Sequence, residues 1–156
     1  MRNVLRLTLA VCAVVTIALG ADNTIGTWRY NTAKSKGAPG VPAVSNLTVT
    51  REATDRGVKI TAKGERADGS KIDAVTDAKY DAKPVNVQGA GQAWDTSALK
   101  QIDADTVTEE RIKTGGKYHS TVRFVVSKDG KTMTATNKGT GADGKKFTAV
   151  AVWDKQ

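Results

Sequence analysis

Histidine, serine and acidic side chains are the groups in this sequence that could do acid–base or nucleophilic chemistry. His119 is the only histidine, and Ser120 follows it directly. Neighbouring residues of a strand point to opposite faces, so these two cannot form a nucleophile–base pair. Glu109 and Glu110 are separated in the same way. We therefore predict no catalytic residues and expect that the protein is not an enzyme.

Metal and cofactor sites find equally little support in the residue types. Cys12 is the only cysteine and His119 the only histidine, so a zinc site is not expected. Asp103 and Asp105 flank a turn, but the remaining ligands of a calcium loop are missing. No glycine-rich phosphate loop opens a helix. We expect no bound metal and no cofactor.

The first twenty residues have the layout of a secretory signal peptide. Arg2 and Arg6 provide a positive start, and residues 7–19 form an apolar stretch that ends in small residues. This stretch is shorter than the roughly 20 residues that a membrane-spanning helix needs. We expect residues 1–20 to be a signal peptide and residues 21–156 to be a single domain that is secreted or periplasmic.

The chain is basic, with a formal net charge of +8. Its lysines and arginines are scattered over the sequence and are not interleaved with aromatic residues, as they would be in a nucleic-acid site. We expect no nucleic-acid partner. The positive charge is compatible with weak contact with the anionic surfaces of a cell envelope.

Alternation of apolar and polar residues predicts strands along the whole mature chain. Asp-Gly pairs at 68–69, 129–130 and 143–144 favour tight hairpins, which join neighbouring antiparallel strands. We predict an all-β fold, an up-and-down antiparallel meander of 8–10 strands closed into a small barrel, because closure removes unpaired edges. The expected strands are residues 25–31, 44–53, 57–66, 70–80, 83–88, 95–103, 106–113, 117–127, 131–140 and 145–154.

The two ends of the mature chain resemble a known group of barrels. Gly26-Thr27-Trp28-Arg29 resembles the first strand of lipocalins and fatty-acid-binding proteins, the calycin group, and Val152-Trp153-Asp154-Lys155 resembles the close of the fatty-acid-binding barrel. The chain is also similar to small exported bacterial proteins that open with Gly-Thr-Trp. The resemblance implies that Trp28 plugs one end of the barrel. Ala151 stands where fatty-acid-binding proteins carry a ligand-gripping arginine, so a fatty-acid ligand is not implied.

Small residues on the expected inward faces are compatible with two functions. They would leave room for a small apolar or amphipathic ligand, or they would let the walls approach around a filled core, and the sequence leaves both open. The first reading gives a lipocalin-like binder, with loops 34–44 and 88–92 at the cavity mouth; the second gives a structural or interaction protein of the cell envelope without a ligand. The predicted ligand-binding residues are Tyr118, Val122, Phe124, Met133, Phe147, Ala149, Ala151 and Trp153.

Overall fold

The computed structural model describes residues 20–38 and 41–156, so the expected signal peptide lies outside it except for Gly20. The described chain forms one antiparallel sheet of eleven strands. The strands are β1 (Gly26–Tyr30), β2 (Val44–Thr54), β3 (Gly57–Arg66), β4 (Lys71–Lys79), β5 (Val85–Asn86), β6 (Gln88–Ala90), β7 (Thr96–Gln101), β8 (Thr106–Ile112), β9 (His119–Val126), β10 (Thr132–Thr140) and β11 (Lys146–Lys155).

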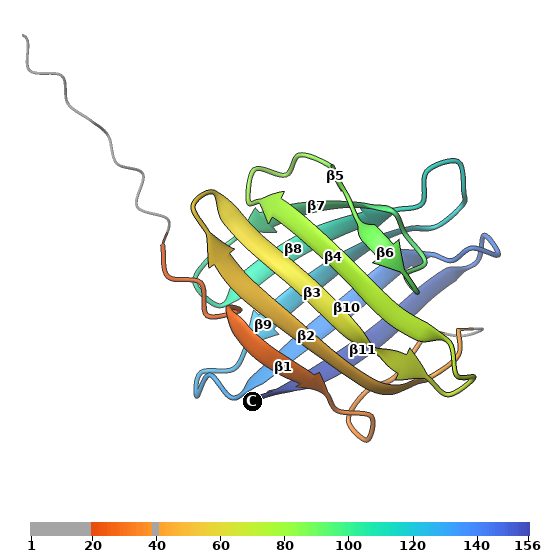
Figure 1. The fold of residues 1–156 in the computed structure, drawn as a ribbon, viewed down its shortest axis with the longest axis horizontal. Coiled ribbons are helices and arrows are strands. Elements are labelled where there is room, and N and C mark those ends of the chain that lie inside the picture. Colours follow the sequence, from red (N-terminus) through yellow and green to blue (C-terminus); the bar gives the residue numbers. More distant parts are fainter. Residues whose placement is uncertain (1–19, 39–40) are drawn as a thin grey trace, which may run out of the picture.

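The strands follow one another around a nearly closed barrel. Their order is β5-β7-β8-β9-β10-β11-β1-β2-β3-β4-β6. Consecutive strands are therefore neighbours from β1 to β4 and from β7 to β11, the last strand β11 pairs with β1, and the short strands β5 and β6 lie at the two ends of the order. In Figure 1, β1 to β4 form one wall, and β7 to β10 cross behind them as the opposite wall. The predicted all-β antiparallel meander is confirmed, with eleven strands in place of the expected 8–10.

The Asp-Gly pairs form the hairpin turns that the sequence predicts. Gly69, Gly130 and Gly144 have φ angles of 81°, 69° and 83°, in the left-handed region that favours glycine. In each turn, the carboxylate of the preceding aspartate accepts a hydrogen bond from the backbone N–H two residues later, as in the 2.9 Å bond from Lys145 to Asp143. The same local chemistry therefore builds three hairpins of the barrel.

The barrel closes through one short stretch of chain. The sequence predicts a single strand at 83–88, but the structure divides this region into β5, which pairs with β7, and β6, which pairs with β4. The stretch thus bridges the two edges of the sheet. Gly89 has a φ angle of 97°, and a Cβ atom there would lie 2.1 Å from the carbonyl oxygen of Asp73. The close approach of β6 to β4 therefore requires glycine at this position.

Two buried apolar clusters fill most of the barrel. The larger one joins β1 to strands β9, β10 and β11 and contains Trp28, Val122, Phe124, Val126, Met133, Ala135 and Trp153. The smaller one lies between the opposite walls and contains Val58, Ala78, Leu99 and Val107. Strand alternation places these side chains inward, and the space between the clusters contains the candidate site.

Candidate ligand-binding site

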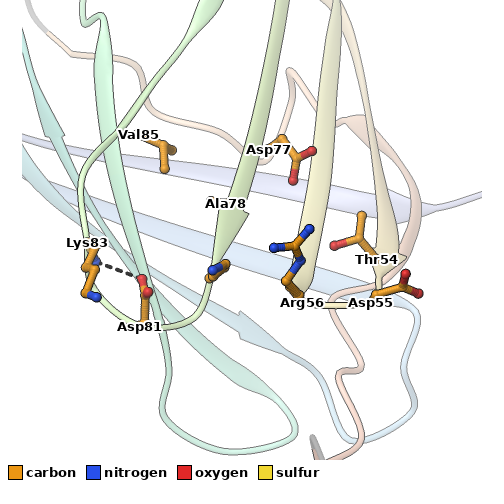
Figure 2. Close-up of a pocket in the computed structure, with 9 residues that line it drawn as sticks. Thr54, Asp55, Arg56, Asp77, Ala78, Asp81, Lys83 and Val85 are labelled. Carbon is orange, nitrogen blue, oxygen red and sulfur yellow. Dashed lines mark hydrogen bonds between the residues drawn. The ribbon is translucent and has the colours of Figure 1, made fainter.

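The surface hollow in Figure 2 lies at one end of the barrel. It has a volume of about 410 Å³ and is bordered by the β2–β3 hairpin and by the loop after β4. Asp81 accepts a 3.0 Å hydrogen bond from the backbone N–H of Lys83, and both residues are exposed. None of the charged residues around this hollow takes part in an ion pair within the described chain. The charged groups of the hollow are therefore unpaired in the described chain and lie at the surface, as expected for solvated side chains.

A second cavity lies inside the barrel and has a volume of about 120 Å³. One part of its wall is apolar and includes Leu47, Val49, Ile60, Met133 and Trp153. The other part is polar and includes Thr76, Gln92, Arg51, Glu109 and Arg111. The cavity therefore has the two kinds of surface that a small amphipathic molecule needs.

The structure brings three of the predicted ligand-binding residues to this cavity. Phe124, Met133 and Trp153 line it, and each is at most 7% exposed. The other five lie outside the residues that line it. Val122 belongs to the larger apolar cluster and Ala151 packs against that cluster. The remaining three are Tyr118, Phe147 and Ala149.

Tyr118 and Phe147 belong to an aromatic row next to the cavity. The rings of Trp94 and Tyr118 are stacked with their centres 5.9 Å apart, and the ring of Phe147 follows at 6.0 Å from Tyr118. Trp94 itself lines the cavity, and the guanidinium carbon of Arg111 lies 4.1 Å from the centre of its ring. The aromatic row helps to position Arg111, because the guanidinium group of Arg111 packs on the ring of Trp94.

The loops expected at the mouth differ in their relation to the cavity. Gln92 belongs to the loop 88–92 and lines the cavity. No described residue of the other loop, residues 34–44, does so. Instead, Lys36 pairs with Val150 of β11 through two backbone hydrogen bonds of 2.7 and 2.8 Å. Lys36 therefore pairs with β11 beyond the point where β1 ends at Tyr30.

Sequence analysis missed the charged side chains of the cavity. Arg51 is 2% exposed and Glu109 is 4% exposed, although neither was among the predicted ligand-binding residues. The alternation itself carries the signal that could have found them. Arg51 shares the inward parity of Val49 on β2, and Glu109 shares that of Val107 on β8.

Glu109 and Arg111 form a buried ion pair on β8. A guanidinium nitrogen of Arg111 lies 2.8 Å from one carboxylate oxygen of Glu109, and the hydroxyl of Ser97 donates a hydrogen bond to the other. Burial acts to raise the pKa of Glu109, but the charge of Arg111, the bonds from Arg111 and Ser97, and the charge of Arg51 outweigh it. The pKa of Glu109 is therefore below its usual value, and the side chain is an anion at neutral pH.

Arg51, on β2, also lines the cavity and is held by uncharged partners. Its Nε donates a 3.0 Å hydrogen bond to the hydroxyl of Thr24, and a terminal nitrogen lies 3.5 Å from the hydroxyl of Tyr80. Tyr80 donates to the carboxylate of Asp22. Burial is the largest cause that raises the pKa of Tyr80 to about 12, and the charge of Arg51 opposes it. This network joins residues 22–24 to the inside of the barrel.

We expect Tyr80 to ionise close to pH 12 in the folded protein. In an alkaline titration followed by tyrosinate absorbance, the difference between wild type and Tyr80→Phe should have its midpoint near 12 and not near 10. Because the folded pKa is raised, this side chain contributes stability that is complete below pH 10 and is lost as the pH rises towards 12. A difference curve centred on pH 10 would contradict the buried network.

Trp28 lies at the end of the barrel that these N-terminal residues cover. Its side chain is fully buried, and its Nε1–H donates a 2.8 Å hydrogen bond to the carbonyl oxygen of Thr24. The Nζ of Lys155 lies 5.1 Å from the centre of the indole ring. Trp28 does not line the cavity, so its contacts are those of a packing residue.

No protein-family model and no curated protein matches this sequence. Within residues 20–38 and 41–156, no three histidine, cysteine or acidic side chains are grouped to hold a metal ion. The same residues contain no helix of the length and apolar character that a membrane crossing requires. The fold and the cavity define a small antiparallel barrel that encloses two arginines and a glutamate.

Proposed function

We propose that the protein is an exported, lipocalin-like binder of one small amphipathic molecule inside the barrel. The observation that carries this proposal is the cavity itself, which is lined both by apolar side chains and by the polar side chains of Arg51, Glu109 and Arg111. The calycin-like opening and ending of the chain support it, and the signal-like residues 1–20 support export.

The volume of the cavity limits the size of the ligand. Cavities that bind drug-sized ligands measure roughly 300 Å³ or more, whereas this one measures about 120 Å³. An apolar cavity of about 150 Å³ is large enough for benzene. The present cavity is somewhat smaller than that, so the ligand is at most about the size of a single ring or a short branched chain.

The same volume favours the second candidate function, a structural or interaction protein of the cell envelope. In that case, the barrel interior serves only to hold the walls together, and the small space is a packing gap. Binding of a ring-sized probe separates the two candidates.

We expect benzamide, benzoate or both to bind inside the barrel. In a ¹⁵N–¹H NMR titration, the indole N–H signals of Trp94 and Trp153 should shift, because both residues line the cavity. The signal of Trp28 should stay in place and serves as the internal control. If neither probe shifts the two signals, the interior is filled and the second candidate is correct.

A cavity-filling variant makes the test specific to this space. Ala74 lines the cavity and is 4% exposed, so Ala74→Leu should occupy its volume and lower the affinity for the probe by at least about tenfold. Ala98→Leu is the matched control. Ala98 pairs with the exposed Glu110 and does not line the cavity. Thermal unfolding of both variants checks that the barrel remains folded.

A further inference from the structure

The charges around the cavity do not balance. Two guanidinium groups, those of Arg51 and Arg111, face one carboxylate, that of Glu109. Glu109 already pairs with Arg111 and accepts a bond from Ser97. Arg51 forms no ion pair with any acidic side chain in residues 20–38 and 41–156, and it is only 2% exposed. Its hydrogen-bond partners, Thr24 and Tyr80, are uncharged, and it acts on Glu109 only through space. A buried cation without a direct ion pair is costly, so a negatively charged group beside Arg51 would be stabilised.

The hydrogen-bond inventory of the wall points in the same direction. Arg111 and Trp153 both line the cavity, and each has a buried N–H donor, Nε and Nε1 respectively, without an acceptor. Both groups can only donate. Two donors that belong to lining residues therefore lack an acceptor. A ligand that brings acceptor oxygens fits this wall better than one that brings donors.

Phe124 places the two arginines around one part of the cavity. The guanidinium carbon of Arg51 lies 5.5 Å from the centre of its ring, and that of Arg111 lies 5.7 Å from it. The apolar side chains of Leu47, Val49 and Ile60 form another part of the wall. A ligand with one anionic end and one apolar end therefore finds a matching surface for each.

We propose that the cavity selects small monocarboxylates, whose carboxylate takes the place of the missing counter-charge of Arg51 and whose apolar part faces Leu47, Val49 and Ile60. This inference rests on the proposed function and names its ligand class. Arg51 lies on β2, so the site does not use the last-strand position that Ala151 occupies. Arg111 orients the carboxylate from the other side while it keeps its pair with Glu109.

Benzoate and benzamide test the inference, because they have nearly the same size and shape and differ in charge. We expect the wild-type protein to bind benzoate at least about tenfold more tightly than benzamide, since bonds to charged groups are stronger than neutral ones. In NMR titrations, benzoate should shift the Nε–H signals of Arg51 and Arg111 more than benzamide does. Equal affinities for the two probes would overturn the inference and leave the proposed function intact. Failure of both probes to bind would contradict the proposed function itself.

Arg51→Met is the variant that isolates the charge. It should reduce the preference for benzoate to about threefold or less while the affinity for benzamide changes little, since the apolar wall remains. Arg123→Met is the matched control, because Arg123 is exposed on β9 and should keep the full preference. If Arg51→Met keeps the full preference for benzoate over benzamide, the assignment of Arg51 as the carboxylate-binding residue is wrong. If Arg51→Met does not fold, the wild-type comparison and the arginine signals decide the outcome alone.

Discussion

Replacing Glu109 by Ala should lower the free energy of unfolding by about 3–5 kcal/mol, the range for removing one partner of a buried ion pair. Arg111 would keep its place in the barrel, with a side chain that is only 17% exposed, and would lose its carboxylate. Ser97 would lose the acceptor of its hydroxyl. Urea unfolding followed by circular dichroism measures the change.

Glu110 provides the matched control for this substitution. It is the next residue along β8 and is exposed, so Glu110→Ala should change stability by no more than about 0.5 kcal/mol. The double variant Glu109→Gln, Arg111→Met should be more stable than Glu109→Ala, because it removes the charge of Arg111 together with that of its partner. Equal losses for Glu109→Ala and Glu110→Ala would show that the pair does not stabilise the barrel.

The ion pair between Glu109 and Arg111 also makes the stability of the protein depend on pH. The pKa of Glu109 is lower in the folded protein than its ordinary value of 4.5. The stability that results is therefore present above pH 4.5 and is lost as the pH falls through the folded pKa. The difference in the free energy of unfolding between wild type and Glu109→Ala should therefore decrease as the pH falls below 4.5.

Trp28→Ala should also cost about 3–5 kcal/mol, the usual loss for a large aromatic residue in a core. Its side chain is fully buried in the larger apolar cluster, and its indole N–H bonds to Thr24. Trp28→Phe keeps most of the packing and should cost less. Trp94→Ala is the control, because Trp94 is only half-buried. A loss below about 1 kcal/mol for Trp28→Ala would contradict a packing role for this residue.

The sequence was sufficient to predict the strands and their order because both follow from local chemistry. The Asp-Gly turns fix which strands are neighbours, and alternation on β9 separates buried Val122 and Phe124 from exposed Arg123. Closure through residues 85–90 could not be predicted in this way. It depends on where the two edges of the sheet meet, and the residues that meet there, such as Gln88 and Val75, are paired only in the folded barrel.

The candidate site was predicted in part, for a similar reason. Phe124, Met133 and Trp153 were found because apolar residues at inward positions are the expected pattern. Arg51 and Glu109 were missed because a charged residue in a strand is usually solvated, although each shares the inward parity of an apolar neighbour, Val49 on β2 and Val107 on β8. Partners that are distant in the sequence or two residues away form hydrogen bonds with these buried side chains. Thr24 accepts a hydrogen bond from Arg51, while Ser97 and Arg111 bind Glu109.

The pairing of β1 with β11 sets the order in which this chain can fold. Trp28 lies opposite Lys155, and the backbone N–H of Gln156 bonds to the carbonyl oxygen of Thr27, so the C-terminus lies beside the first strand (Figure 1). Contacts between such distant parts of a chain close a long loop and slow folding. The hairpins can form as each pair of strands becomes available, but the cluster around Trp28 is complete only when Trp153 arrives. We therefore expect the barrel to complete its interior, and with it the charged cavity, only when β11 pairs with β1.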